Sequence, residues 1–93
     1  MERSKNCVLQ LPISNPALLE PFVDACVRDG VRLIAIVGDG SRKTEDLIDE
    51  LIVGDGSDES RLSVATTSHP DETVEEVMAF AASGNADVSL VKL

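Results

Sequence analysis

The fold is decided by one stretch of the chain, Val31-Arg32-Leu33-Ile34-Ala35-Ile36-Val37-Gly38-Asp39-Gly40-Ser41. Its middle, residues 33–37, is an unbroken apolar run, which is typical of a strand in a parallel sheet that helices cover on both faces. Residues 38–41 then turn the chain sharply and place small polar groups at the carboxyl end of that strand. In open α/β sheets, ligands bind at this edge.

The rest of the chain alternates strand-like and helix-like segments around this stretch. Strand patterns cover residues 7–11, 32–37, 61–67 and 87–93. Val88 and Leu90 alternate with Ser89, which indicates an edge strand or a half-covered one. The order β-α-β-α-β-α-β predicts a single α/β domain over residues 1–93, with a flexible N-terminus at residues 1–6 and a four-stranded parallel sheet with right-handed crossovers.

Capping residues, prolines and glycines mark the three expected helices. Pro21 complicates the first helix, because proline inside a helix removes a hydrogen bond. Either residues 15–20 form a separate turn before a helix that starts near Pro21, or one helix bends there. The expected helices are one from the cap Asn15 to Gly30, one capped by Thr44 that buries Leu47, Ile48, Leu51 and Ile52 and ends at Gly54, and one from residues 68–72 to residues 83–85.

Two strand orders remain open. The flavodoxin-like order 2-1-3-4 is favoured, but it would leave the very apolar strand of residues 32–37 at an edge, which would then need cover from another subunit. The Rossmann-like order 3-2-1-4 places that strand inside. The first order puts the two acidic helices side by side on one face, whereas the second places them on opposite faces.

Charge separates several function classes. The chain carries a formal charge of −9, and eleven acidic residues face only Arg61 between residues 44 and 76. Nucleic acids and anionic membranes both require clustered Lys and Arg, so we expect neither as a partner. A basic protein partner suits this balance, as does solubility alone.

The cysteines and the N-terminus bear on the compartment. There is no apolar run long enough to span a membrane and no secretory pattern at the start, which favours a cytoplasmic protein. Cys7 and Cys26 would both lie near the same end of the sheet, so a disulfide is geometrically conceivable. In a reducing compartment, two buried thiols that act as small hydrophobic side chains are the favoured interpretation.

The turn at residues 38–41 could hold an anion. Gly38 and Gly40 permit close backbone approach, and Arg42 and Lys43 supply the densest positive charge in the chain. However, the pattern is neither G-x-G-x-x-G nor a Walker loop, and Asp39 would repel a phosphate. The five residues 37–41, VGDGS, recur at residues 53–57. The first copy follows a strand and the second follows a helix, which indicates shared turn chemistry and not a duplication. A plain strand-to-helix turn is the favoured interpretation.

His69 is the one histidine and follows the third expected strand. A Ser–His–Asp set for acyl transfer could assemble at this edge, but the chain has no nucleophile elbow, and His69 could simply cap the helix before Pro70. The acidic loop at residues 55–59 lacks calcium-loop spacing, so we expect no metal and no cofactor. The candidate ligand edge comprises Ser14, Asn15, Asp39, Gly40, Ser41, Arg42, Lys43, Ser68 and His69.

Acidic side chains crowd the outer faces of the second and third expected helices. A solvated surface is the simple interpretation, and a docking face for a basic protein is the functional one. The candidate docking residues are Asp46, Asp49, Glu50, Glu72, Glu75 and Glu76.

Residues 80–91, FAASGNADVSLV, resemble the closing helix-turn-strand of barstar-type ribonuclease inhibitors. Those proteins are also small, acidic α/β domains with a parallel sheet, so the resemblance implies an inhibitory or immunity role. The aromatic-rich helix with which such inhibitors dock has no counterpart here, so the likeness is an analogy. The sequence thus favours a non-enzymatic protein-interaction module, with self-association through an edge strand as one form. The alternative is an anion- or nucleotide-binding module, or a hydrolase-like enzyme, at the carboxyl edge.

Overall fold

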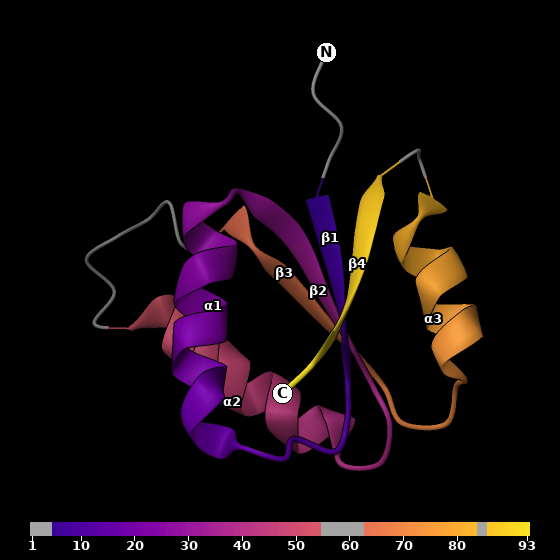
Figure 1. Ribbon diagram of the computed structural model, residues 1–93, viewed down its shortest axis with the longest axis horizontal. Coiled ribbons are helices and arrows are strands. Elements are labelled where there is room, and N and C mark those ends of the chain that lie inside the picture. The colour runs from indigo at the N-terminus through magenta and orange to yellow at the C-terminus, as the bar shows by residue number, and fades with distance from the viewer. Residues whose placement is uncertain (1–4, 55–62, 84–85) are drawn as a thin grey trace.

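The computed structural model describes residues 5–54, 63–83 and 86–93. Four strands form one all-parallel sheet, and helices pack on both of its faces (Figure 1). The predicted α/β fold with a four-stranded parallel sheet is confirmed. In chain order, the elements are β1 (Lys5–Gln10), the 3₁₀ helix η1 (Pro16–Leu18), α1 (Leu19–Arg28), β2 (Val31–Val37), α2 (Ser41–Val53), β3 (Ala65–His69), α3 (Val74–Ala81) and β4 (Asp87–Lys92).

The strand order is β3-β2-β1-β4, so the favoured order 2-1-3-4 is wrong and the alternative 3-2-1-4 is confirmed. β2 pairs with both β1 and β3, and helices cover both of its faces, so Ile34, Ala35 and Ile36 are completely buried. An edge position would have left this apolar strand half covered, and the observed order removes any need for a partner there. β4 forms one edge, as its alternating pattern predicted, and β3 forms the other.

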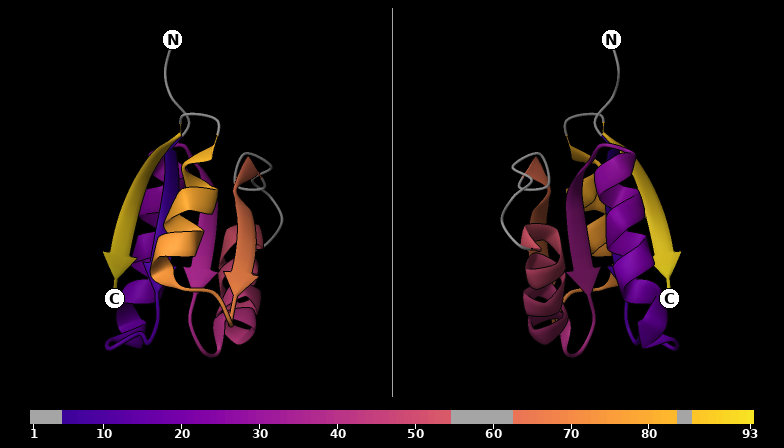
Figure 2. Two further views of the ribbon diagram at one scale, coloured as in Figure 1. Left: turned by 90° about the vertical axis from the view of Figure 1, so that its right-hand side faces the viewer. Right: turned by 90° about the vertical axis from the view of Figure 1, so that its left-hand side faces the viewer.

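The helices divide unequally between the two faces. One core cluster joins α1 and α2 to the sheet through residues such as Val23 and Ile48, and a second joins α3 through Val77 and Ala81. Figure 2 shows α3 alone in front of the middle strands, with β3 and β4 on either side of it. The acidic helices α2 and α3 therefore lie on opposite faces, as the order 3-2-1-4 requires.

β1 begins at Lys5, so the expectation of a flexible segment at residues 1–6 is wrong for Lys5 and Asn6. Lys5 pairs with Val31 and with Asp87 in the neighbouring strands. The Asn6 side-chain Nδ2 donates to the carbonyl oxygen of Ala81 at 2.7 Å, which ties this end of the strand to α3. Residues 1–4 lie outside the described residues.

The Pro21 question is resolved in favour of a separate turn. η1 is capped by Asn15, whose Oδ1 accepts from the Ala17 amide at 3.2 Å, and α1 then begins at Leu19. Pro21 is the third residue of α1, in the first turn, where backbone amides have no partner within the helix. The proline therefore costs α1 no hydrogen bond.

α2 begins at Ser41, three residues before the expected cap, so the assignment of Thr44 as the cap is wrong. Gly40 caps the helix with φ of 84°, a left-handed conformation that glycine adopts without strain. The Thr44 amide already donates to the Gly40 carbonyl at 3.1 Å inside the helix. The C-terminal end at Gly54 is confirmed.

β3 and α3 both start later than the sequence pattern predicted. β3 covers Ala65–His69, and residues 61–62 of the expected strand lie outside the described residues. α3 begins at Val74, because Thr73 and Glu76 form a capping box in which each side chain accepts from the other residue's amide at 3.1 Å. The expected start at residues 68–72 is therefore wrong, since β3 and a connecting bend occupy that segment.

Candidate functional site

The carboxyl ends of the strands meet at one edge, as expected for a parallel sheet. The Leu11 amide donates to the Val37 carbonyl at 3.0 Å, and the Asn15 amide donates to the Leu93 carbonyl at 3.1 Å. These bonds place the segment that follows β1 beside the end of β2 and beside the residue that follows β4. The predicted ligand-edge residues therefore come from neighbouring segments, although their side chains do not share one face.

The turn at residues 38–41 is closed by its own hydrogen bonds. The Gly38 amide donates to the His69 carbonyl at 3.2 Å, and the Ser41 amide donates to the Gly38 carbonyl at 3.2 Å. Gly38 has φ of 122°, and a Cβ there would lie 3.1 Å from Leu11 Cβ. Two of the amides that could have faced an anion are thus used to hold the fold.

Ser41 is the first residue of α2 and is fully buried, and its hydroxyl has no hydrogen-bond partner among the described residues. Arg42 and Lys43 follow it on the exposed side, next to exposed Asp39. The buried hydroxyl and the exposed cations do not converge on a common point, so the turn has the geometry of a strand-to-helix connection.

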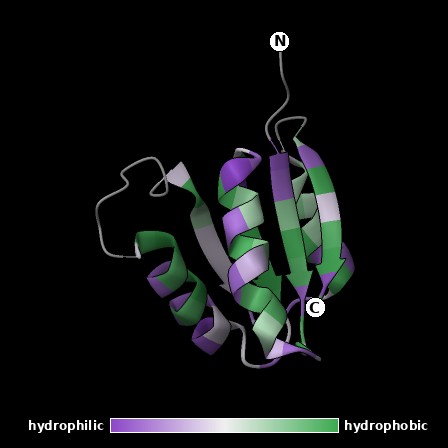
Figure 3. Cartoon of the chain, turned by 60° about the vertical axis from the view of Figure 1, so that its left-hand side comes forward, coloured by the Kyte–Doolittle hydropathy of each residue, from purple (hydrophilic) through white to green (hydrophobic). Residues whose placement is uncertain are grey.

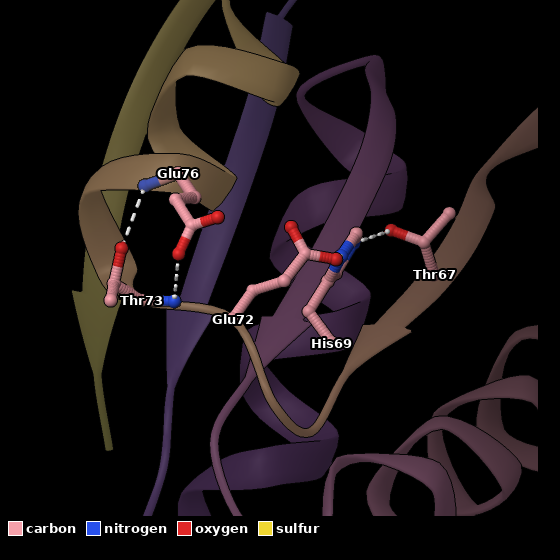
Figure 4. Close-up of polar contacts among 5 residues, drawn as sticks. All are labelled: Thr67, His69, Glu72, Thr73 and Glu76. Atoms are coloured by element: carbon pink, nitrogen blue, oxygen red, sulfur yellow. Dashed lines mark hydrogen bonds and ion pairs between the residues drawn. The ribbon is translucent and has the colours of Figure 1, made fainter.

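His69 is held at both ring nitrogens (Figure 4). Nε2 lies 2.8 Å from Thr67 Oγ1, and Nδ1 lies 2.9 Å from Glu72 Oε1. Because a carboxylate can only accept, Nδ1 of the neutral ring carries the proton, and Nε2 accepts from the Thr67 hydroxyl. The imidazole also packs against the Phe80 ring at a centroid distance of 5.1 Å. His69 therefore joins the end of β3 to the connection before α3 and to α3 itself.

The Ser–His–Asp set that the sequence left open as an alternative does not assemble around His69. Its partners are Thr67 and Glu72, and Ser68 projects to the opposite face of β3 because successive strand residues alternate. Thr67, His69 and Glu72 are linked in the order of a catalytic triad. However, Thr67 lies within a regular strand, paired with Ala35, and not on a sharp turn that exposes a nucleophile beside amide donors. This geometry suits a structural histidine.

The six candidate docking acids are divided between the faces, and three of them have local partners. Asp49 Oδ1 accepts from Thr66 Oγ1 at 2.6 Å, Glu72 holds His69, and Glu76 completes the α3 capping box. All six residues are exposed, and α2 and α3, which carry or follow them, lie on opposite faces of the sheet. The acids therefore do not form one docking surface.

A groove between α1 and α2 was missed by the sequence patterns. It encloses about 280 Å³. Leu47 is 45% exposed, so its expected burial on α2 is wrong. Leu51 is half-buried and packs against the core, and Ile48 and Ile52 are buried as predicted. Figure 3 shows hydrophobic and hydrophilic bands alternating along both helices. The residues that line this α1–α2 groove are Pro16, Leu19, Glu20, Leu47, Glu50 and Leu51.

The sequence shows the α2 side of this groove only as part of an ordinary helical stripe. Leu47 and Leu51 are one turn apart on α2, directly beside the core pair Ile48 and Ile52, and this spacing is that of a core-facing helix surface. The start of α1 at Leu19, after η1, then leaves Pro16 and Leu19 facing these two leucines.

Among the described residues, no group of three or more His, Cys, Asp and Glu side chains is clustered as a metal site would require. None of the helices within residues 5–54, 63–83 and 86–93 has the length and hydrophobicity to cross a membrane.

Comparison with known proteins gives one match. A family model described as Domain of unknown function (DUF7684) matches residues 5–93, a range that contains all four strands and all three α-helices. No curated protein and no solved structure matches the chain.

Proposed function

The chain belongs to the DUF7684 family, a domain of unknown function, and we propose that it is a non-enzymatic module that binds a basic segment of another protein in the α1–α2 groove. The observation that carries the proposal is the lining of this groove, where four apolar residues lie beside two carboxylates. An apolar floor with a charged rim is the usual anatomy of a protein-binding surface. The partner segment would place apolar side chains on the floor and Lys or Arg beside Glu20 and Glu50.

The exposure of the groove residues supports this occupant. Leu47, which lines the groove, is 45% exposed, so apolar surface remains in water at this site. Large side chains that the core does not need are typical of interaction surfaces when they lie together.

Charge favours a basic partner. The chain has a net charge of −9, and Glu20 and Glu50 both line the groove. Opposite charge on the partner would speed the encounter and fix its orientation, and a second acidic copy of this chain would be repelled. Cys7 and Cys26 are free thiols, which fits a reducing compartment and supports the cytoplasm as the site of action.

A binding experiment with designed peptides tests the proposal. The probe is a fluorescein-labelled amphipathic helix with leucine on one face and lysine on the other, and a peptide with glutamate in place of lysine is its control. Fluorescence anisotropy should show binding of the lysine peptide alone. Leu47→Ser should weaken it about 3- to 10-fold, because the exposed 45% of a leucine is worth roughly 1 kcal/mol when buried.

A matched pair of charge reversals separates groove binding from general attraction. Glu50→Lys changes the groove, whereas Glu75→Lys makes the same change in net charge at an exposed position of α3 on the opposite face. Only Glu50→Lys should weaken binding substantially. Equal loss in both variants, or unchanged binding after Leu47→Ser, would refute a site in the groove.

A further inference from the structure

The two edges of the sheet differ in their side chains. β3 forms one edge with a mainly polar sequence, and its threonine hydroxyls are hydrogen-bonded to Asp49 and His69. β4 forms the other edge with the sequence DVSLVK, and its Leu90 is 46% exposed. Figure 2 shows β4 on the outside of the sheet in both views. One edge is therefore polar and engaged, whereas the other presents an apolar strand to solvent.

Nothing in the sequence of β4 blocks pairing with a further strand. Edge strands are usually protected by proline, by β-bulges or by lysines that discourage association. β4 pairs with β1 in an unbroken register from Asp87 to Lys92, so it has no bulge, and it contains no proline. Its one lysine is the last residue, after Leu90 and Val91. A partner strand therefore meets a regular and mainly apolar edge.

Leu90 projects to the face of the sheet that α3 covers. Leu90 is in register with Val8, and both Val8 and Val88 belong to the core cluster beneath α3. Side chains two residues apart on a strand share a face, so Leu90 lies on this face beside Val88. α3 is a helix of eight residues that packs on β1, β2 and β4, and it leaves nearly half of Leu90 in water. The margin of this face therefore carries an apolar side chain that the monomer does not bury.

We propose that two copies of the chain pair through β4 in antiparallel orientation, so that their two four-stranded sheets become one continuous sheet. The two-fold axis of this dimer is perpendicular to the sheet, which keeps the α3 helices of both copies on the same face. A register centred on Leu90 places it opposite Leu90 of the partner subunit, where each side chain covers the other. The β4 edge is separate from the α1–α2 groove, so this dimer is independent of the proposed partner binding.

Charge favours a second copy at β4, although it opposes one in the groove. β4 begins with Asp87 and ends with Lys92, so antiparallel pairing brings opposite charges together at both ends of the interface. The neighbouring strand β1 adds only Lys5. These two strands are therefore not acidic, and the charged residues of β4 complement the same residues of the partner subunit.

The acidic helix α2 lies away from this edge. It carries Asp46, Asp49 and Glu50, and it packs on β2 and β3. β3 is three strand spacings, about 14 Å, from β4. Charges at such a separation are largely screened at physiological salt, where the Debye length is about 8 Å. The two-fold axis also places the acidic first turns of the two α3 helices at opposite ends of the dimer, so the net charge of the chain is compatible with association at β4.

Sedimentation equilibrium of the full chain tests the proposal. Six residues of edge strand form an interface below the roughly 1,200 Å² of standard complexes, so we expect a reversible dimer whose fraction rises with concentration up to about 1 mM. Leu90→Lys should weaken dimerisation by about 10-fold or more, because it places like charges opposite each other on the two-fold axis. Val53→Lys is the matched control, since it makes the same change in charge at a side chain that is also 46% exposed but lies at the end of α2. This control should dimerise like the wild type.

A cysteine substitution tests the register. Residues directly opposite each other in an antiparallel pair have Cβ atoms about 4.5–5.5 Å apart, close enough for a disulfide after a small adjustment. Oxidation of the Leu90→Cys variant should therefore give a covalent dimer. The Ala65→Cys variant, changed at the exposed start of β3, should stay monomeric under the same oxidation.

Three results would overturn the proposal. The first is a wild-type chain that remains monomeric at the highest concentration, and the second is equal dimerisation of Leu90→Lys and Val53→Lys. The third is crosslinking of the Ala65→Cys variant in place of the Leu90→Cys variant. None of these results bears on binding of the lysine peptide in the α1–α2 groove, so failure of the dimer and failure of the proposed function are distinguishable.

Discussion

Adjacent residues of α2 should differ sharply in what they contribute to stability. Ile48 is fully buried between the helix and the sheet, whereas Leu47 next to it is 45% exposed in the α1–α2 groove. Truncating Ile48 to alanine leaves a cavity in a close-packed core, which costs about 2–5 kcal/mol. Truncating Leu47 removes a side chain that is only partly out of water, which costs about 1 kcal/mol.

The size of the domain makes this difference easy to measure. A chain of 93 residues has an unfolding free energy of about 5–14 kcal/mol, so Ile48→Ala removes a large share of it and lowers Tm by roughly 10–30 °C. Urea denaturation followed by circular dichroism at 222 nm is the suitable assay, because the chain has neither Trp nor Tyr for fluorescence. Both variants should keep the wild-type m-value.

One result would refute the reasoning behind the groove. If Leu47→Ala lowers the urea midpoint as much as Ile48→Ala does, then Leu47 belongs to the packed core in solution. The α1–α2 groove would then be closed by its own side chains and would offer no apolar floor to a partner. A loss near 1 kcal/mol leaves Leu47 free to serve binding instead of folding.

Three further predictions concern the carboxyl edge. Thr67→Val removes the hydroxyl that hydrogen-bonds with His69 Nε2. The loss of this bond to a buried ring should lower the unfolding free energy by about 1–3 kcal/mol in urea denaturation, and an unchanged midpoint would show that the contact is absent in solution. Gly38→Ala should destabilise the domain by more than Gly40→Ala, because a Cβ at Gly38 meets Leu11 at 3.1 Å and one at Gly40 meets nothing within 4 Å; the reverse order in thermal melts would contradict the turn geometry. Inorganic phosphate should leave Tm unchanged, because amides of the turn at residues 38–41 already donate within the protein, and a saturable rise in Tm would contradict that account.

The strand order shows what the chain's pattern could decide and what it could not. The apolar run in residues 33–37 correctly predicted a strand covered on both faces. The same run also favours an interior position for this strand. The expected order 2-1-3-4 followed the commoner arrangement of flavodoxin-like sheets instead of this local pattern. An interior strand is flanked on both sides and covered by helices on its faces, so the apolar run predicted the position of β2 better than the commoner strand order did.

Helix starts were predicted less well because several capping residues compete along the chain. Thr73 with Glu76 three residues later is a complete capping box, and this signal outweighed the proline and acids at residues 70–72. At α2, a backbone conformation decided the start, since Gly40 at φ of 84° begins the helix without any capping side chain. Such a conformation is not visible in residue types alone.

For the candidate sites, the position of a residue along the chain was predictable from the sequence, but its partners in space were not. His69 was correctly placed at the end of β3, but its partners Thr67 and Glu72 depend on which face of the strand each side chain occupies and on how the chain bends before α3. The α1–α2 groove depends on the distance between two helices, which helical spacing within one segment cannot predict. Sequence periodicity therefore found the apolar stripe of α2 but assigned all of it to the core.

The central claim is that the α1–α2 groove is the binding surface, and an NMR titration tests it most directly. Uniformly ¹⁵N-labelled protein is titrated with the lysine–leucine peptide, and amide shift changes are followed residue by residue. The largest changes should fall on Leu19, Glu20, Leu47 and Leu51, with Thr67, His69 and Phe80 on the opposite face unaffected. Changes centred on the α3 face, or spread evenly over the acidic residues of both faces, would contradict the claim.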